Sequence, residues 1–424
     1  MITFELPVKY NPRRNQDAMS RFFSTAILLI LYHTVELVVL VHRYWGGRAD
    51  NRNGPILIIA TFHNQNWAVS HILPIASASR LHVTVVTDPV DLILPNVTFR
   101  SPSSTISNIF PRALAKCMLA LRLAVKERPS FIIGYHFFPA GLIALLCRSV
   151  AGGSAVYQST GGQIEIEGGG WNSENRLLRA LKTPSRRLEK KSISLLRKFD
   201  YIIGRGTRIE KFLTEREAAE NYRTILGSVE IPASVPGFLA RDLDIIFLGR
   251  LAESKRLDLL LRIVGLLVVN RPGLRVAIIG DGERKPFLID LCTKLGIGAN
   301  VHFTGRLDNA STWLRRSKLF VLTSRTEGVS IAMLEAMAQG VVPVVIDVGE
   351  LSSVVNNGVN GYLIRSPSKR EFSHRIEDLL SDPARWQSFS NCARLGVTNI
   401  AGRETVIEQW RALFSSNEDA NTTS

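Results

Sequence analysis

From residue 55 onward, short apolar runs alternate with segments long enough to form helices, and no other feature limits the fold of this chain as strongly. Each run ends in a polar or glycine-containing loop. Strands that are apolar along their whole length are typical of parallel sheets covered by helices on both faces. The alternation therefore predicts a parallel α/β architecture. We expect strands at residues 56–61, 83–87, 131–135, 155–158 and 201–203, and a second set at 245–248, 275–279, 301–303, 319–322 and 342–346.

The two sets of strands are separated by residues 230–244, which contain two prolines and a glycine and lack a periodic apolar pattern. Such a segment is typical of a connection between domains, and 424 residues suit two domains. We predict two doubly wound, Rossmann-like domains that face a central cleft, with the site in the loops at the carboxyl ends of the strands. The predicted parts are an N-terminal extension with an apolar helix (1–50), a first domain (51–236), a second domain (237–403), a C-terminal helix that docks on the first domain (404–414) and a disordered tail (415–424).

The chain is basic, because 52 Lys and Arg residues against 37 Asp and Glu residues give a formal net charge of +15. Such a charge attracts anions, which leaves nucleic acid, an anionic membrane or a phosphorylated substrate as partners. The four cysteines are widely spaced, so neither a zinc site nor a redox pair is predicted. Free cysteines favour a reducing compartment, so we expect a cytoplasmic location.

Residues 22–41 are mostly apolar and long enough to cross a membrane. His33 and Glu36 lie near the middle of this stretch, where an acid makes insertion less favourable. Basic residues flank the stretch on both sides, so charge does not set its orientation. A helix docked on the protein or on the membrane surface is the favoured interpretation, and a single membrane span is the alternative.

A second basic stretch, residues 176–198, contains nine Lys or Arg residues and one acid, Glu189. The pattern predicts a basic amphipathic surface at an anionic bilayer, with a solvated helix as the alternative. No recognition-helix motif or aromatic platform accompanies the charge, so nucleic acid is not an expected partner. The apolar residues that recur near helical spacing beneath these charges are Leu181, Leu188, Leu195 and Phe199.

The segment SRTEGVSIAMLEAMAQGVVPVV at residues 324–345 directly follows an expected strand. Its Gly-Val-Ser turn opens an apolar helix, whose first N–H groups and dipole favour an anion such as phosphate. Glu327 and Glu335 flank this site, and carboxylates accept hydrogen bonds from sugar hydroxyls. The alternative is a capped helix with two solvated glutamates. The amides expected at the helix start belong to Gly328, Val329, Ser330 and Ile331.

Five motifs follow one another along the second half of the chain. Together they resemble the retaining glycosyltransferases of family 4, glycosyl transferases group 1, which have the GT-B fold. The resemblance implies a metal-independent enzyme that transfers a sugar from a nucleotide-diphosphate sugar and uses no cofactor. The motifs are GRLAESKRLDLLL at 249–261, IIGDGE at 278–283, VHFTGRL at 301–307, TEGVSIAMLEAMAQGVVPVV at 326–345 and NNGVNGYLI at 356–364.

The resemblance also implies roles for residues of the second domain. Arg250 and Lys255, which follow Gly249, correspond to the pair that grips the donor diphosphate, and fixed positive charge suits a leaving group that becomes more anionic. Glu335 corresponds to the carboxylate that binds the ribose. Glu327 corresponds to the glutamate near the transferred sugar and joins the two cations as a catalytic candidate. The segment that corresponds to the base-binding loop is Gly305, Arg306 and Leu307.

In the first domain, His136 follows an expected strand in the segment FIIGYHFFPAGLIALL. This segment resembles the family's arrangement in which a histidine faces the donor sugar and the acceptor, which makes His136 a catalytic candidate. His63 is a further acceptor-side candidate, although the family's glycine-rich loop is replaced there. Gly161 and Gly162 open the segment TGGQIEIEGGGW, for which an acceptor loop and an edge hairpin stay equal alternatives.

Two further patterns bear on cofactors and metals. The glycines of IIGDGE lack the third glycine of a dinucleotide fingerprint, so no nicotinamide or flavin is expected. Asp242 and Asp244 precede a strand instead of ending one, so no metal site is predicted.

From the motifs, charge and hydropathy together, we predict a peripheral glycosyltransferase on the cytoplasmic face of the membrane, with a membrane-proximal or lipid-linked glycan acceptor, in envelope or exopolysaccharide biosynthesis. The alternatives are a non-catalytic glycosyltransferase-like scaffold and another GT-B enzyme such as a nucleotide-sugar epimerase.

Overall fold

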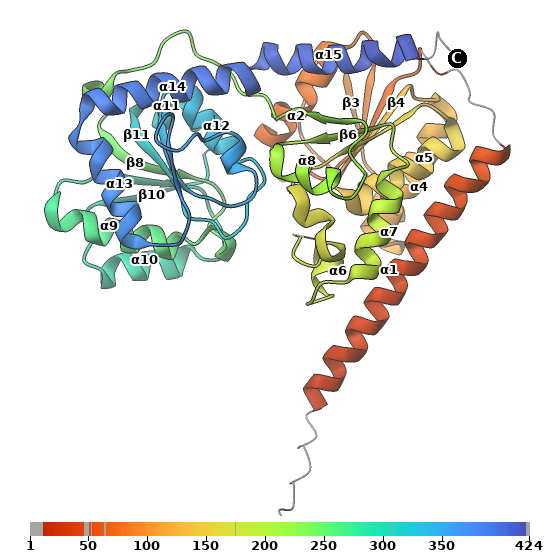
Figure 1. The fold of residues 1–424 in the computed structure, drawn as a ribbon, viewed down its shortest axis with the longest axis horizontal. Helices are drawn as coiled ribbons and strands as arrows, with labels where there is room; N and C mark the ends of the chain where they lie inside the picture. The colour runs from red at the N-terminus through yellow and green to blue at the C-terminus, as the bar shows by residue number, and fades with distance from the viewer. Residues whose placement is uncertain are drawn as a thin grey trace, which may run out of the picture.

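The computed structural model describes residues 12–45, 51, 53–62, 65–173, 175–307 and 309–420. Two parallel sheets form two lobes that lie side by side (Figure 1). The predicted α/β architecture of two doubly wound domains is confirmed. The first domain contains one sheet and the second domain the other, and helices separate successive strands along most of the chain.

The first sheet has seven strands in the order β3-β2-β1-β4-β5-β6-β7. Leu57 and Ile59 of β1 face one apolar cluster, whereas Ile56 and Ile58 face another, which explains why this strand is apolar throughout. The sequence did not predict the edge strands β3 and β7, because exposed or polar residues interrupt their apolar pattern. The strands are β1 (Ile56–Ile59), β2 (Val83–Val86), β3 (Val97–Arg100), β4 (Phe131–Tyr135), β5 (Ser154–Gln158), β6 (Tyr201–Gly204) and β7 (Tyr222–Thr224).

The second sheet has six strands in the order β10-β9-β8-β11-β12-β13. Five of them match the predicted runs, and the sixth, β13, has only three residues and was missed. The strands are β8 (Leu243–Leu248), β9 (Val276–Ile279), β10 (Val301–Gly305), β11 (Ser317–Leu322), β12 (Val342–Ile346) and β13 (Tyr362–Ile364).

The helices that link the strands pack on both sheets. Those of the first domain are α2 (Gln65–Ala78), α3 (Ser104–Ile109), α4 (Arg112–Glu127), α5 (Leu142–Ala151), α6 (Arg176–Arg179), α7 (Arg186–Leu196) and α8 (Thr207–Thr214). Those that follow are α9 (Leu257–Asn270), α10 (Lys285–Lys294), α11 (Ser311–Arg316), α12 (Ile331–Ala338), α13 (Lys369–Ser381), α14 (Pro383–Ala401) and α15 (Arg403–Ala420).

The C-terminal helix α15 returns to the first domain, where it packs on α2 (Figure 1). Trp410 and Phe414 are buried there, and the Phe414 ring lies 4.8 Å from that of Phe131 on β4. The helix continues to Ala420, so the prediction of a disordered tail is wrong for residues 415–420. The polar residues there end the apolar pattern but include no proline or glycine that would stop the helix. Residues 421–424 lie outside the described part of the chain.

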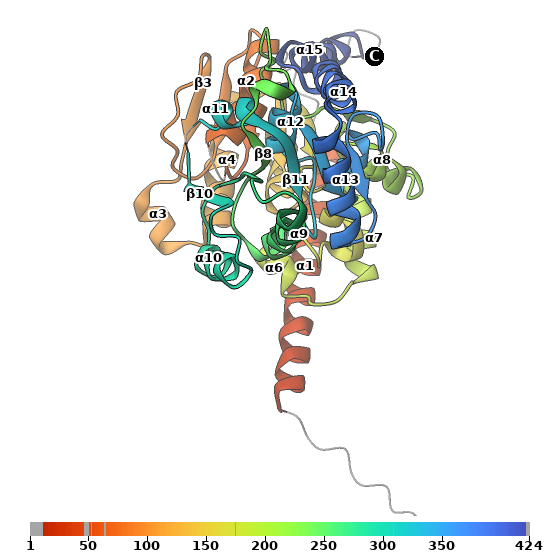
Figure 2. The same ribbon diagram turned by 90° about the vertical axis from the view of Figure 1, so that its left-hand side faces the viewer.

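The apolar N-terminal helix α1 (Pro12–Trp45) docks along α5 and α7. Leu28, Tyr32, Val35 and Val39 are buried in this contact. Glu36, the acid in the middle of the apolar stretch, accepts hydrogen bonds from Lys191 and from Ser194 Oγ of α7. Its position inside an apolar helix is therefore explained by a polar contact with the domain. The N-terminal end of α1 extends beyond the rest of the first domain (Figures 1 and 2).

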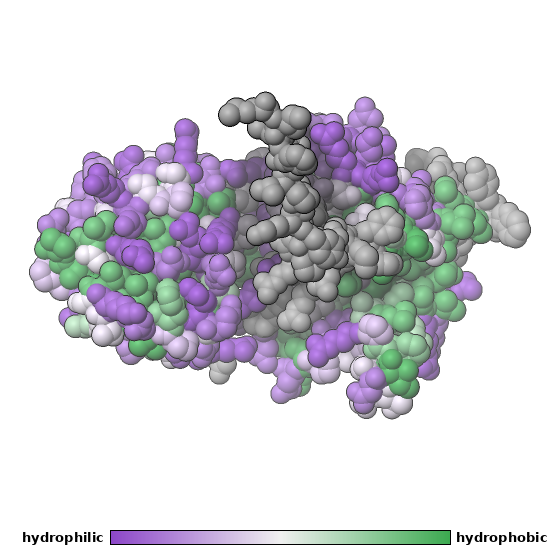
Figure 3. Space-filling model, turned by 90° about the horizontal axis from the view of Figure 1, so that it is seen from below, coloured by the Kyte–Doolittle hydropathy of each residue, from purple (hydrophilic) through white to green (hydrophobic). Residues whose placement is uncertain are grey.

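The outer face of α1 is apolar. The side chains of Ile27, Ile30 and Leu37 are 62%, 66% and 62% exposed. By length and composition, residues Ser24–Val41 could cross a membrane. Seen from this end of the molecule, apolar side chains lie among polar ones on the surfaces of both lobes (Figure 3). One face of α1 thus belongs to the protein core and the other faces outward without an apolar partner among the described residues.

The amphipathic surface predicted for residues 176–198 differs in the structure. Leu181, Leu188, Leu195 and Phe199 are all buried in the core of the first domain, so their apolar side chains are not available to a bilayer. That half of the prediction is wrong, because the helical spacing of these residues serves packing on the protein. The basic half is kept in part, since Arg186, Arg187 and Lys190 are exposed.

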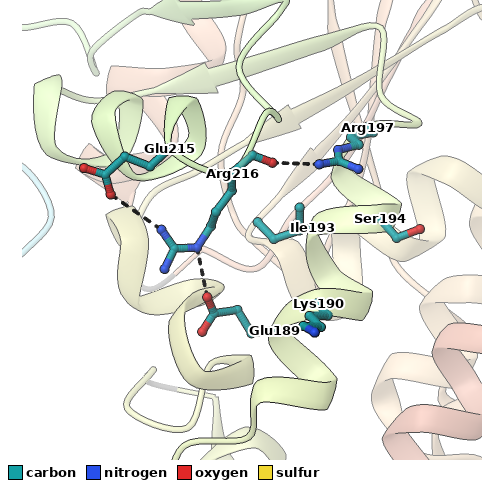
Figure 4. Close-up of a pocket in the computed structure, with 7 residues that line it drawn as sticks. All are labelled: Glu189, Lys190, Ile193, Ser194, Arg197, Glu215 and Arg216. Carbon is teal, nitrogen blue, oxygen red and sulfur yellow. Dashed lines mark hydrogen bonds and ion pairs between the residues drawn. The ribbon is translucent and has the colours of Figure 1, made fainter.

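A hollow of about 630 Å³ lies between α7 and the end of α8, and its wall carries both signs of charge (Figure 4). Arg216 Nε donates to Glu189 Oε1 at 2.9 Å, and Arg197 donates to the Arg216 carbonyl at 2.8 Å. The first contact pairs Arg216 with Glu189, the one acid of residues 176–198, and the neutral carbonyl removes no charge. Two cations of the stretch pair with acids elsewhere, Lys191 with Glu36 and Arg197 with Glu217. These two charges are therefore less available to an external anion than the residue count predicts.

Candidate active site

The loops after β8 and β9 touch at the carboxyl edge of the second sheet. The Gly249 N–H donates to the Ile279 carbonyl at 3.0 Å. The Leu251 N–H donates to the Asp281 carbonyl at 2.9 Å. A Cβ atom on Gly280 would lie 1.9 Å from the Gly249 carbonyl oxygen. Glycine is therefore required where the two motif-bearing loops meet.

Lys255 and Glu327, two of the predicted catalytic candidates, form an ion pair at this edge. Lys255 Nζ donates to Glu327 Oε1 at 2.7 Å. The Glu327 side chain is 7% exposed and that of Lys255 is 21% exposed, so water screens the pair weakly. Arg250 lies on the same loop as Lys255 and is exposed. The structure thus brings the predicted phosphate-binding loop and the predicted sugar-binding glutamate into direct contact.

Helix α12 begins at Ile331, with Ser330 as its N-cap: Ser330 Oγ accepts from the Met333 N–H at 3.3 Å. Of the four amides predicted for the helix start, only that of Ile331 lies within the helix, and Gly328 and Val329 precede the cap. The first turn still has N–H groups without intrahelical acceptors, as every helix does.

Glu335 lies on α12, one turn beyond Ile331, and is partly buried. Burial raises the pKa of its carboxyl group to about 7. A carboxyl group with that pKa changes between a proton donor and a pure acceptor near neutral pH.

The loop after β10 joins the same edge of the sheet. The Gly280 N–H donates to the Gly305 carbonyl at 2.9 Å, which ties this loop to the one after β9. Arg306 is exposed, and Leu307 packs against the core of the domain. The predicted base-binding segment therefore lies beside the loops that carry the predicted phosphate-binding residues.

In the first domain, His136 stands at the end of β4 with an unusual backbone (φ 68°, ψ 146°). Its ring is 39% exposed, and Nδ1 lies 3.0 Å from Glu165 Oε1. Thr160 Oγ1 lies 2.7 Å from the same nitrogen. Backbone strain in a non-glycine residue is found mostly at functional sites. His63, the other predicted histidine, lies outside the described residues.

The glycine-rich segment after β5 folds into two short 3₁₀ turns, Gly162–Glu165 and Glu167–Gly169. It forms no strand, so the edge-hairpin alternative is wrong. The turns carry Glu165 back beneath His136, which the sequence did not predict. The Gly161 N–H donates to the Glu165 carboxylate, and a Cβ on Gly162 would lie 3.4 Å from Glu350 Oε1 of the second domain. The two predicted glycines therefore stand where the domains meet.

The second domain also contacts the start of α8 in the first. Glu350, which is 1% exposed, accepts hydrogen bonds from the Arg208 N–H at 3.1 Å and the Ile209 N–H at 2.8 Å. Ser353 Oγ accepts from the Thr207 N–H at 3.0 Å. The loops at the carboxyl edges of the two sheets are thus in contact. Sequence reasoning missed Glu350, because nothing in a single sequence pairs this acid with a helix start that lies 141 residues earlier at Ile209.

A buried cation, Arg205, directly follows β6 close to this contact and is 3% exposed. Its guanidinium donates to His71 Nε2 at 2.6 Å, while His71 Nδ1 donates to the Trp67 carbonyl at 2.8 Å. Burial and the charge of Arg205 hold the pKa of His71 well below its usual range, so the ring is neutral. A Cβ on the neighbouring Gly227 would touch both His71 and Ile331 of α12.

The predicted absence of a metal site concerned Asp242 and Asp244. Arg316 Nε donates to Asp242 Oδ1 at 2.8 Å, and Lys318 Nζ donates to Asp244 Oδ1 at 2.8 Å. Among the described residues there is no group of three or more His, Cys, Asp or Glu side chains arranged to hold a metal ion.

Residues 235–395 match the family described as Glycosyl transferases group 1. An uncharacterized glycosyltransferase of Haemophilus influenzae is 28% identical over 171 residues, which are 40% of this chain and 48% of that protein. The poly(ribitol-phosphate) alpha-N-acetylglucosaminyltransferase of Staphylococcus aureus is 26% identical over 227 residues, which cover 51% of this chain and 46% of that protein. The chain thus spans about half the length of the curated relatives it matches.

Among solved structures, the Anabaena protein Alr3699/HepE in complex with UDP-glucose superposes with a TM-score of 0.68 at 17% sequence identity. The superposition covers 86% of this chain and 100% of that one. Residues 235–395 are therefore similar to the glycosyl transferases group 1, and the two domains together have the GT-B fold.

Proposed function

We propose that the protein is a retaining, metal-independent glycosyltransferase that uses no bound cofactor. It binds a nucleotide-diphosphate sugar mainly in the second domain and transfers the sugar to an acceptor held by the first. The observation that carries this proposal is the joining of Lys255, Glu327 and the start of α12 at one sheet edge, inside the segment that matches the family.

The donor diphosphate binds Arg250, Lys255 and the first N–H groups of α12. Since Lys255 is already paired with Glu327, the phosphate competes for this cation. Transfer of Lys255 to the phosphate frees the Glu327 carboxylate to accept hydrogen bonds from sugar hydroxyls. Glu335, partly buried beyond the helix start, accepts from the ribose hydroxyls when it is ionised.

In the transfer step, the bond between the sugar C1 and the diphosphate oxygen breaks, and the acceptor oxygen bonds to C1 on the same face. The acceptor's proton goes to an oxygen of the departing phosphate. Arg250, Lys255 and the α12 dipole stabilise the charge that develops on the leaving group. His136 forms a hydrogen bond with a sugar hydroxyl beside the reacting centre. Contact between the two domains excludes water from the site.

The relatives support the classes of donor and acceptor. The Anabaena structure holds UDP-glucose, and the name of the Staphylococcus aureus relative states an N-acetylglucosaminyl transfer to poly(ribitol-phosphate). For this chain we therefore propose a nucleotide-sugar donor and a glycan-type acceptor, as in envelope or exopolysaccharide biosynthesis.

The outer face of α1 supports a place on the cytoplasmic surface of the membrane. Ile30 and Leu37 point away from the domain, and exposed cations of α7 lie on the adjoining helix. Because α1 packs lengthwise on α5 and α7, we place it in the plane of the interface instead of across the bilayer. An acceptor on a membrane lipid would then meet the first domain directly.

The test is binding and hydrolysis of UDP-, GDP- and ADP-sugars by the full chain, with Lys255→Ala and Glu335→Ala as variants. Lys294→Ala is the matched control, because Lys294 is an exposed cation of α10. We expect one donor class to bind, both site variants to lose it and the control to keep it. Absence of binding to every donor, with liposomes present, would overturn the enzymatic proposal in favour of a scaffold.

A further inference from the structure

One buried carboxylate, Glu165, lies directly beneath His136. We propose that Glu165 is a positioning residue that fixes the proton of His136 on Nδ1 and holds its ring in one orientation. The inference deepens the proposed function, because it rests on His136 acting beside the transferred sugar. It concerns a residue for which the family motifs give no role.

The Glu165 carboxylate is saturated by donors. Oε2 accepts from the Phe137 N–H at 2.8 Å and from the Tyr157 hydroxyl at 2.8 Å. Oε1 accepts from the Thr160 N–H at 3.0 Å, from the Thr160 hydroxyl at 3.3 Å and from the Gly161 N–H, and it lies 3.0 Å from His136 Nδ1. An ionised carboxylate offers about four lone-pair positions. No room is left for a proton on Glu165.

The charge state of Glu165 agrees with this geometry. Burial alone would raise its pKa, but the charge and hydrogen bond of His136 and the N–H groups of Gly161 and Phe137 lower the pKa to about 2. With this pKa the group is ionised, and so only an acceptor, at neutral pH. An acceptor facing Nδ1 requires the ring to carry its proton there, and in the neutral ring Nε2 is then an acceptor.

The contacts of Glu165 also fix the backbone that carries the histidine. Oε2 holds the N–H of Phe137, the next residue, while the His136 N–H donates to the Gln158 carbonyl at 3.0 Å. These bonds lie on either side of the strained φ of 68° at His136. Glu165 thus fixes the backbone from which the ring extends and is the carboxylate that faces Nδ1, while the Thr160 hydroxyl lies 2.7 Å from Nδ1 and 3.0 Å from Nε2.

The same cluster touches the second domain. A Cβ on Gly328 would lie 2.2 Å from the Thr160 carbonyl oxygen, so the loop before α12 contacts the residue beside the His136 ring. Gly328 directly follows Glu327, the partner of Lys255. Glu165 therefore orients His136 at the boundary with the proposed donor site. A carboxylate whose only role was to stabilise its own loop would not require the contact with His136 Nδ1.

The first experiment needs no variant. In protein labelled with ¹⁵N-histidine, long-range ¹H–¹⁵N spectra distinguish the two ring tautomers, and His136→Gln assigns the signal. We expect His136 in the Nδ1–H form, lost or mixed in Glu165→Gln. A His136 ring in the Nε2–H form, or a spectrum unchanged by Glu165→Gln, would overturn the proposal. This result does not depend on catalysis.

The second experiment is a double-mutant cycle on turnover of the donor selected by the panel above. Glu165→Gln is expected to lower kcat on the order of 100-fold, with the KM for donor within about threefold, because the lost function is orientation. The double variant Glu165→Gln with His136→Gln should be no slower than His136→Gln alone. Losses that multiply would show that Glu165 acts apart from the histidine and would refute the proposal.

The matched control is Glu167→Gln, an exposed acid two residues along the same loop. Its kcat should stay within about twofold of wild type, since Glu167 contacts only Gln163 at 3.2 Å among the side-chain bonds described. A wild-type chain that turns over no nucleotide sugar would count against the proposed function alone, because the tautomer measurement still decides the role of Glu165.

Discussion

The two domains place polar groups at the carboxyl edge of a parallel sheet in different ways. In the second domain, Lys255 and Glu327 each lie in a motif that is readable in the sequence, and Lys255 remains partly accessible although Glu327 is buried. In the first domain, Glu165 and Arg205 are buried and reach the edge from separate strands and turns. A site whose residues lie in local motifs leaves a sequence signature, whereas one whose residues are brought together only by the fold leaves almost none.

The largest expected effect distinguishes the donor-binding role proposed for the second domain from the acceptor-binding role proposed for the first. Lys255→Ala removes a phosphate-binding cation and leaves the Glu327 carboxylate buried without its partner, so we expect donor affinity to fall on the order of 100-fold or more. His136→Gln should leave donor affinity within about threefold, since its domain is proposed to hold the acceptor. Isothermal titration with the selected nucleotide sugar measures both. Equal losses in the two variants would break the distinction between a donor domain and an acceptor domain.

The next effect concerns the backbone contact that shapes the donor edge. Gly280 has a φ of 136° and no room for a Cβ against the Gly249 carbonyl, so Gly280→Ala should destabilise the protein by about 3 kcal/mol. Gly298→Ala is the control, because nothing lies within 4 Å of its would-be Cβ. Chemical denaturation of each variant gives the free energy of unfolding. A cost at Gly280 no greater than at Gly298 would show that the two loops do not require this glycine.

The proposed membrane face is the outer side of α1, next to the first domain, and liposome flotation tests it. Replacing both Ile30 and Leu37 by Glu removes two exposed apolar side chains, each contributing about 1.5 kcal/mol or more when buried in lipid, so binding should fall at least tenfold. Val269→Glu on α9 of the second domain, also exposed, is the matched control and should bind as wild type. Gel filtration decides the competing case: a variant that loses a dimer but keeps its lipid binding would assign the face to a second copy of the chain.

Acid–base behaviour offers a further contrast between the domains. The pKa of Glu335 is raised to about 7 by burial, so its ionised, acceptor form grows from about a tenth to about nine tenths between pH 6 and pH 8. Donor affinity should therefore rise by up to about tenfold over this interval, and the rise should vanish in Glu335→Gln. The pKa of Glu165 is about 2, so this carboxylate should add no pH dependence between pH 6 and pH 8. A donor affinity that falls as pH rises would contradict the ribose role of Glu335.

The sequence predicted ten of the strands, because buried parallel strands are continuous apolar runs. It missed β3, β7 and β13, which stand at sheet edges or have only three residues. Helical spacing alone also could not tell whether Leu181, Leu188, Leu195 and Phe199 face a bilayer or the core. Burial decides this, and all four face the core.

The distance along the chain between interacting residues also explains which residues of the site the sequence could predict. Glycine motifs and paired carboxylates are visible in sequence because their spacing is local, as with Gly249 and Lys255. Glu165 carried one signal, an acid alternating with isoleucine in a glycine-rich segment, but that pattern equally describes a hairpin. Arg205 and Glu350 carried none, since their partners lie far along the chain, on α2 and α8. Contacts of that range are set by the fold.

The smallest predicted effect lies at the boundary between the domains, which belongs neither to the donor-side loops nor to the buried groups of the first domain. Glu350 accepts the first N–H groups of α8 across this boundary, so Glu350→Gln weakens a helix cap and a contact that holds the domains together. We expect a cost of about 1 kcal/mol and a few-fold lower kcat at unchanged donor affinity. Ser353→Ala, which removes the neighbouring acceptor of the Thr207 N–H, should act in the same direction but less strongly. If both variants lowered donor affinity instead, the second domain would depend on the first to bind its ligand. The contrast between a self-contained donor site and a buried acceptor-side network would then be wrong. A single site shared by both sheets would replace it.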